Sequence, residues 1–84
     1  MVRVEFYGLA RLRAGRAELA VEASTIGEAL AAADAACPEL RSRSDTGVSP
    51  QYRVSVGGRH FTENPDEPLA GGEALVVLGA DAGG

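Results

Sequence analysis

Lysine is missing from this chain, and the residues that build metal and disulfide sites are scarce. All eight basic residues are arginines, Cys37 is the single cysteine and His60 the single histidine. One cysteine excludes an internal disulfide and any cysteine-rich zinc or iron–sulfur centre. His60 has no neighbours at metal-ligand spacing, which is typical of an ordinary strand residue, so we expect no metal site. Without lysine the folded body offers no ε-amine, and any conjugation would need an acceptor on another molecule.

The sequence also lacks a long hydrophobic run and an excess of positive charge. No segment is long enough to span a bilayer, and the N-terminus begins directly with an alternating pattern rather than a targeting signal. The net charge of −4 argues against nucleic-acid or anionic-membrane partners and suits docking on a basic surface. Together with the single cysteine, this predicts a cytoplasmic protein.

The short length limits what the chain can do. Eighty-four residues without a break in composition predict one domain, too small to enclose an active site as well as a core. We find no paired nucleophile and base, no phosphate-binding loop and no metal cluster. The chain is therefore expected to be a carrier or partner rather than an enzyme, with no catalytic residues and no bound cofactor of its own.

Alternating patterns predict five strands. Apolar and polar residues alternate over 2–7 and 17–22, which indicates an antiparallel hairpin with a long loop between its strands. The runs 52–56 and 59–62 flank Gly57-Gly58, which fits a two-residue hairpin turn with positive φ. The polar segment 41–50 is predicted to be a loop, and the hydrophobic run at 74–78 is the last strand.

One helix is predicted over residues 25–36. Thr25 and Glu28 form a capping-box pattern, and Pro38 ends the helix because the residue before a proline avoids the α region. Apolar residues recur at helical spacing along one side, which should face a sheet: Ile26, Leu30, Ala33 and Cys37. Cys37 is interpreted as a small buried hydrophobe.

The chain ends in small residues that directly follow the last strand. We divide it into a folded domain, 1–78, and a tail, 79–84. Extended at about 3.3–3.6 Å per residue, such a tail reaches roughly 20 Å, far enough to bring the carboxylate of Gly84 into a partner's pocket. Gly83 has no Cβ to collide with a narrow channel, and Ala82 and Asp81 would pass through it as well.

The last strand is expected to carry a docking patch. Leu75 and Val77 share one side of the strand, and Val76 and Leu78 share the other. Because one helix covers one face of a sheet, we predict that Val76 and Leu78 stay partly exposed and bind a partner. The alternative is that both faces of a central strand are covered.

These elements together resemble a known family. Phe6-Tyr7-Gly8 ends the first strand and Arg11 follows shortly after it; the capped helix at 25, Val56-Gly57-Gly58, the segment 68–73 and Gly83-Gly84 complete the pattern. This order resembles the MoaD/ThiS sulfur-carrier family. The resemblance implies an α+β, ubiquitin-like β-grasp with a mixed sheet of four to five strands and one main helix on one face. The segment from Phe6 to Arg11 and the length look more like MoaD, of molybdopterin synthase, than ThiS, although MoaD tails commonly carry a proline near the end and this tail has none.

The resemblance also implies a chemistry and its partners. An E1-like enzyme would use ATP to adenylate the Gly84 carboxylate, and a sulfurtransferase or cysteine desulfurase would supply the sulfur that makes a thiocarboxylate. An acceptor synthase would then receive the sulfur for a cofactor or metabolite, with molybdopterin slightly preferred over thiamine, cysteine or another product. Arg11, Val76 and Leu78 would be the docking residues.

Two other functions compete with the sulfur carrier. A ubiquitin-like modifier would be joined through Gly84 to lysines of other proteins, and it begins with the same adenylate. A β-grasp interaction module with an incidental tail would keep its function when Gly83 and Gly84 are removed.

Overall fold

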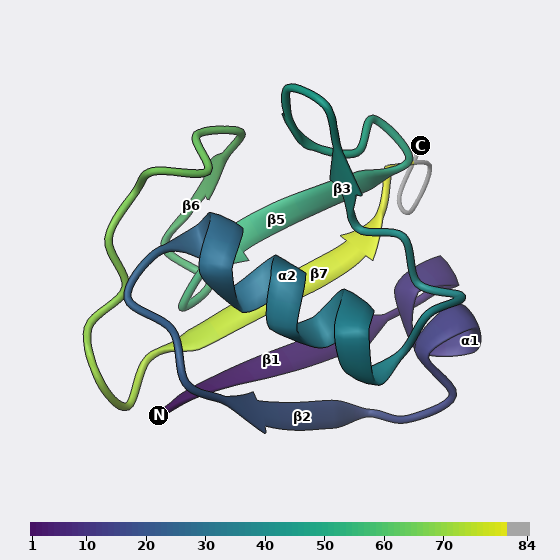
Figure 1. The fold of residues 1–84 in the computed structure, drawn as a ribbon, viewed down its shortest axis with the longest axis horizontal. Helices are drawn as coiled ribbons and strands as arrows, with labels where there is room; N and C mark the ends of the chain where they lie inside the picture. Colours follow the sequence, from purple (N-terminus) through teal and green to yellow (C-terminus); the bar gives the residue numbers. More distant parts are fainter. Residues whose placement is uncertain (81–84) are drawn as a thin grey trace.

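The computed structural model describes residues 1–80, which form a five-stranded sheet, a separate two-stranded hairpin and two helices (Figure 1). The predicted tail residues Asp81, Ala82, Gly83 and Gly84 lie outside the described residues. The elements follow in the order β1 (Val2–Tyr7), α1 (Leu9–Ala14), β2 (Glu18–Val21), α2 (Ile26–Ala36), β3 (Arg43–Ser44), β4 (Gly47–Val48), β5 (Tyr52–Val56), β6 (His60–Thr62) and β7 (Ala74–Gly79).

The large sheet is mixed, with the last strand at its centre. Its order is β2-β1-β7-β5-β6; β1 and β7 run parallel, and the other neighbours are antiparallel. The expected fold class, a mixed sheet with one main helix, is confirmed. β7 extends one residue beyond the predicted 74–78 and ends at Gly79.

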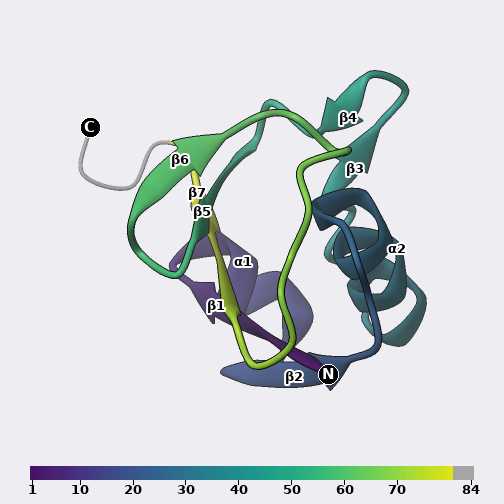
Figure 2. The ribbon, with the colours of Figure 1, turned by 90° about the vertical axis from the view of Figure 1, so that its left-hand side faces the viewer.

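The core lies between one face of this sheet and α2 (Figure 2). Val4 and Phe6 on β1 pair with Leu75 and Val77 on β7, and all four side chains are buried. From the helix, the predicted stripe of Ile26, Leu30, Ala33 and Cys37 is buried against them. The period-2 pattern of the strands and the period-3.6 pattern of α2 thus bury one side of each element.

The start of α2 is capped as the sequence predicts, with one change of partner. The Thr25 hydroxyl accepts a hydrogen bond from the backbone N–H of Glu28 at 3.2 Å. The Glu28 carboxylate accepts in return from the N–H of Ser24 at 2.7 Å, one residue earlier than in the usual capping box. The carbonyl of Glu67 accepts from the N–H of Ile26 at 3.0 Å, so the long loop before β7 helps to satisfy this helix end.

The loop predicted between the first two strands contains a short helix, α1. Its six residues are too few to show a helical period, and for that reason the sequence pattern missed it. Gly8 and Gly15 flank the helix with φ of 56° and 72°, values that glycine adopts without strain. Ala10 is fully buried in the core, so α1 closes the end of the core where β1 and β7 finish.

Two further expectations about loops were wrong. The polar segment 41–50 contains the hairpin of β3 and β4, which is tied to α2 because the Asp34 carboxylate accepts hydrogen bonds from the N–H and hydroxyl of Ser42 at 2.8 and 2.7 Å. The turn before β6 spans residues 57–59 rather than two glycines, so β6 begins at His60. Gly57 and Gly58 do have the predicted positive φ.

Candidate functional site

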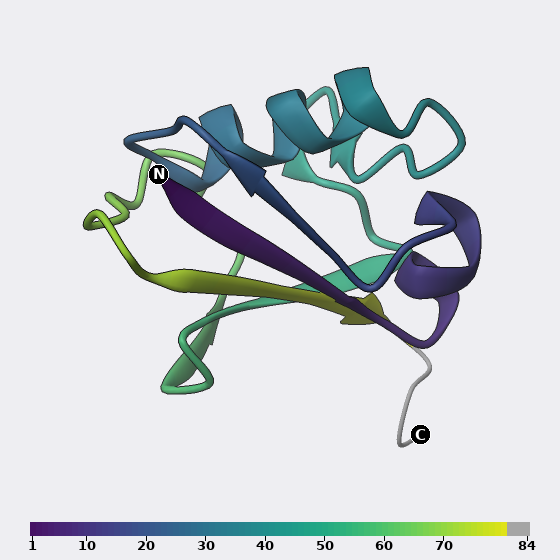
Figure 3. The same ribbon diagram turned by 90° about the horizontal axis from the view of Figure 1, so that it is seen from below.

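The tail root, which we define as Gly79 and Ala80, is held firmly in the sheet. β7 is bonded to β1 on one side and to β5 on the other. Beyond it, the N–H of Ala80 donates to the carbonyl of Gln51 at 2.8 Å. A Cβ built on Gly79 would lie 3.0 Å from the Cβ of Leu9. Glycine at 79 therefore lets α1 pack directly beside the end of β7 (Figure 3).

Side chains from α1 and β5 tie the surroundings of the tail root together. The Arg13 guanidinium donates to the Gln51 side-chain oxygen and, at 3.2 Å, to the Tyr52 hydroxyl. The Tyr52 hydroxyl donates in turn to the carbonyl of Leu40. Three segments distant in sequence are linked at this point, so the position of Ala80 just beyond β7 is fixed by the fold.

The open face, the side of the large sheet away from α2, carries an apolar centre next to the tail root. Val76 lies between Glu5 and Ser55, and Leu78 lies between Tyr7 and Arg53. Val76 and Leu78 are partly buried, whereas Leu75 and Val77 on the core side are fully buried. The predicted division of β7 into a covered side and a partly exposed side is confirmed. The two faces of this strand are therefore covered to different extents, unlike in the alternative in which both are covered.

A polar row on β1 borders the apolar centre. The Glu5 carboxylate accepts hydrogen bonds from Arg3 Nε at 2.8 Å and from the Tyr7 hydroxyl at 2.9 Å. The hydrogen bond from Arg3 lowers the pKa of Glu5 most, and the hydrogen bond from Tyr7 lowers it further. The hydrogen bond between Tyr7 and Glu5 also raises the pKa of Tyr7. The phenol ring of Tyr7, half exposed beside Leu78, is therefore held in one orientation with its hydroxyl protonated at neutral pH.

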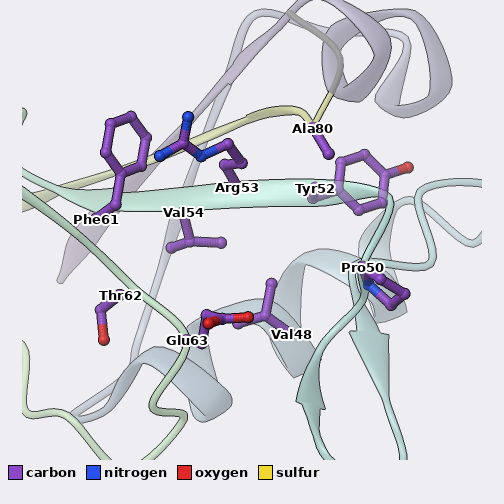
Figure 4. Close-up of a pocket in the computed structure, with 9 residues that line it drawn as sticks. All are labelled: Val48, Pro50, Tyr52, Arg53, Val54, Phe61, Thr62, Glu63 and Ala80. Carbon is purple, nitrogen blue, oxygen red and sulfur yellow. The ribbon is translucent and has the colours of Figure 1, made fainter. Parts of the chain in front are cut away.

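The other border is an exposed aromatic ring with a cation above it. The Arg53 guanidinium lies 4.0 Å from the centroid of the Phe61 ring, which is 51% exposed. These two residues and Ala80 line a slot of about 440 Å³ beside the tail root, with Val48 and Pro50 opposite (Figure 4). Apolar surface, the Arg53 guanidinium and the Glu63 carboxylate thus line this slot.

His60 and Cys37, the single histidine and the single cysteine, lie in surroundings typical of structural residues. His60 lies on β6, and its Nε2 is 2.6 Å from a carboxylate oxygen of Glu67. Across residues 1–80, no group of three or more histidine, cysteine, aspartate or glutamate side chains could hold a metal ion. Cys37 is buried at the end of α2. Over the same range, no helix has the length and apolar character needed to cross a membrane.

The structure brings only some of the predicted docking residues together. Val76 and Leu78 lie on the open face, immediately before the tail root, whereas Arg11 lies on α1 at the end of the sheet. Tyr7, Arg53 and Phe61 flank the two apolar residues and were not predicted from the sequence. The period-2 parity of β1 and β5 was the signal that could have placed Tyr7 and Arg53 there.

Comparisons with known proteins agree on the fold. No protein-family model and no curated protein matches the sequence. Among solved structures, SAMP1, the small archaeal modifier protein 1 of Haloferax volcanii, has a TM-score of 0.82 at 24% identity, covering 99% of this chain and 98% of that one. A chain of the Amycolatopsis orientalis BexX/CysO complex has a TM-score of 0.79 at 19% identity over 100% of both chains. A Pyrococcus furiosus protein named provisionally as molybdopterin converting factor, subunit 1, has a TM-score of 0.73 at 19% identity over 93% and 94%.

These likenesses cover 93–100% of the chain and show the ubiquitin-like β-grasp fold that the family resemblance implied. The structures that share it include a named modifier protein, a CysO complex and a converting-factor subunit. The class that fold and site define together is a small β-grasp protein with a fixed tail root beside a partly apolar open face.

Proposed function

We propose that the protein is a sulfur carrier whose Gly84 carboxylate is activated by an E1-like enzyme and converted to a thiocarboxylate. The observation that carries the proposal is the central strand β7, which is anchored on both sides and leads into a short tail ending Gly83-Gly84. The similarity in fold to SAMP1, to the BexX/CysO complex and to the converting-factor subunit supports it.

The chemistry requires activation because a carboxylate is a poor acylating agent. The α-carboxyl group has a pKa of about 3.3–3.7, so it is ionised at neutral pH. One carboxylate oxygen would attack the α-phosphorus of ATP, forming an acyl adenylate and releasing pyrophosphate. The sulfur of hydrosulfide would then attack the carbonyl carbon, and the bond from that carbon to the AMP oxygen would break. The products are the thiocarboxylate, AMP and a proton.

In this reaction the chain would present its C-terminal carboxylate to the activating enzyme and would not catalyse a step itself. The tail root fixes where the tail starts, and Val76 and Leu78 offer apolar area beside it for the activating partner. ATP would be bound by that partner. A sulfurtransferase or cysteine desulfurase would supply the sulfur as a persulfide, and a thiol would release it as hydrosulfide by forming a disulfide with the inner sulfur. An acceptor synthase for molybdopterin, or for another sulfur-containing cofactor or metabolite, would consume it. A cytoplasmic location suits these partners.

Intact-protein mass spectrometry tests the proposal directly. The full chain is incubated with ATP, a candidate E1-like enzyme and sulfide, beside a variant lacking Gly83 and Gly84. We expect a gain of about 16 Da, one oxygen replaced by sulfur, in the full chain only. Gly83→Val should also fail because its side chain obstructs a narrow channel, whereas Ala80→Val, at an exposed position, should still react. A sulfur gain in the truncated chain would contradict the proposal.

A second candidate is a ubiquitin-like modifier, which the name of the small archaeal modifier protein favours. Here a lysine amine of a target would attack the same adenylate and form an isopeptide bond. Trypsin digestion is poorly suited to detecting this bond. The last arginine is Arg59, so trypsin leaves the long branch of residues 60–84 on the target lysine. Cleavage before Asp81 leaves a compact Asp-Ala-Gly-Gly branch, and its recovery on target lysines would support the modifier.

A further inference from the structure

The outer side of α1 exposes a leucine between arginines. Leu12 is 78% exposed, the highest value among the exposed large hydrophobic side chains of residues 1–80. Arg11 precedes it, and Arg16 lies just past the end of the helix; both are exposed. We call Arg11, Leu12 and Arg16 the α1 patch. It lines a shallow concavity of about 570 Å³ together with Gly8, Gly15 and Ala17.

The exposure of Leu12 is fixed by the backbone. The N–H of Leu12 donates to the carbonyl of Gly8 at 3.1 Å, and the N–H of Gly15 donates to the carbonyl of Arg11 at 3.0 Å. Ala10, on the opposite side of the helix, is fully buried. Because α1 cannot rotate without exposing Ala10, Leu12 must face solvent unless another molecule covers it.

The charge around the α1 patch differs in sign from the net charge of the chain. Within residues 1–80, neither Arg11 nor Arg16 forms a salt bridge, whereas Arg3 and Arg59 are paired with glutamates. The loop that joins β6 to β7 lies at the other end of the sheet (Figure 1) and carries an acidic group: Glu63, Asp66, Glu67 and Glu73. Arg11 and Arg16 therefore lie at the opposite end of the sheet from this acidic group.

The α1 patch is close to the tail root. Leu9 of the same short helix packs against Gly79, and Arg13 reaches Gln51, whose carbonyl bonds Ala80. Figures 1 and 3 both place α1 at the end of the sheet where β7 finishes. A protein that received the tail would therefore also meet α1.

We propose that the α1 patch docks an acidic and apolar protein segment beside the channel that receives the tail. Carboxylates of the partner would pair with the guanidinium groups of Arg11 and Arg16, and an apolar side chain would cover Leu12. This inference rests on the proposed function. The net charge suggests a basic partner surface, whereas at this end of the molecule we expect an acidic one. A nucleic acid would leave Leu12 uncovered, and the net charge of −4 opposes its approach.

A titration followed by nitrogen-15 NMR tests the α1 patch without any enzyme. The probe is a twelve-residue peptide of glutamate and leucine; the controls are the same peptide with lysine for glutamate, and a ten-nucleotide oligo-dT. We expect the acidic peptide alone to shift the amides of α1 and of residues 15–17. Arg11→Glu, Arg16→Glu and Leu12→Ser should each weaken this binding about tenfold. Arg43→Glu, an equal charge change on β3, should not.

The activation assay supplies the second measurement. Arg11→Glu and Arg16→Glu should raise the KM of the activating enzyme for this chain about tenfold with kcat unchanged, and Arg43→Glu should change it less than about twofold. Three results would overturn the inference. The first is an equal change of KM in Arg11→Glu, Arg16→Glu and Arg43→Glu. The others are amide shifts caused by the lysine peptide or the oligo-dT rather than the acidic peptide, and no amide shift with the acidic peptide. If the wild-type chain is never activated but the acidic peptide binds α1, the sulfur-carrier function fails while the docking surface stands.

Discussion

The two faces of the large sheet are built from the same strands but have different contents. On the core side, β1, β5 and β7 present valine, leucine and phenylalanine that are buried under α2. On the open face, the intervening residues form a small apolar centre, Val76 and Leu78, bordered by an ion-paired row and an arginine stacked on an aromatic ring. The core face supplies stability, and the open face leaves apolar area that no helix of residues 1–80 covers.

Leu75→Ala should produce the largest change in stability. Leu75 is fully buried between β1 and β5, and truncating such a leucine costs about 2–5 kcal/mol of the free energy of unfolding. Denaturant unfolding at constant m-value measures this loss. The matched control is Leu78→Ala, three residues on and on the open face, which should cost much less. Equal losses would show that the two faces do not differ as described.

Gly79→Ala should have the next largest effect, at the junction of β7 and α1. The new Cβ would lie 3.0 Å from the Cβ of Leu9, and overpacking of this kind costs about 1–3 kcal/mol. Thermal unfolding gives the loss, and amide shifts of α1 report its displacement. Ala80→Gly, one residue later and exposed, serves as the control. An unchanged α1 spectrum in Gly79→Ala would contradict the close packing.

Leu78→Ser should separate binding from stability. The side chain is only partly buried, so we expect unfolding to change by about 1 kcal/mol or less. If Leu78 belongs to the docking surface, the activating enzyme should bind this variant roughly tenfold more weakly. Steady-state activation kinetics and denaturant unfolding on the same preparation test both expectations. A stability loss as large as that of Leu75→Ala, with unchanged kinetics, would remove Leu78 from the docking surface.

Glu67→Gln should have the smallest effect and should appear only at acid pH. The hydrogen bond from His60, and then that from Thr62, lowers the pKa of Glu67 in the folded chain. The unfolded chain therefore takes up a proton first as the pH falls. The stabilisation is present above the ordinary glutamate pKa of about 4.3, and it is lost as the pH falls through the lower, folded value. Denaturation midpoints between neutral and strongly acid pH should fall less steeply in Glu67→Gln than in Glu63→Gln.

The sequence predicted the elements that have a clear period. The parity of residues 2–7 and 74–78 placed Val76 and Leu78 on the partly exposed side, and Thr25 with Glu28 located the start of α2. These features depend on neighbours in sequence, so a local pattern contains the information. The docking role of Val76, Leu78 and Arg11 stays a prediction.

The sequence could not predict features that depend on contacts between distant residues. α1 has six residues, and it is held by the packing of Ala10 in the core and of Leu9 against Gly79 rather than by a helical period. The β3–β4 hairpin is tied down by Asp34, eight residues before Ser42. The pairing of Arg53 with Phe61 needs the strand register, which no local pattern gives.

The position of β7 also determines how the molecule responds to force. This strand is hydrogen-bonded to β1 in parallel and to β5 in antiparallel orientation. A pull on Ala80 along the strand direction would load both hydrogen-bond ladders in shear. The bonds would share the load and would have to yield together, whereas strands peeled apart break one bond at a time. Hydrogen bonding on both sides of β7 thus lets the domain resist a pull applied at the end of this strand.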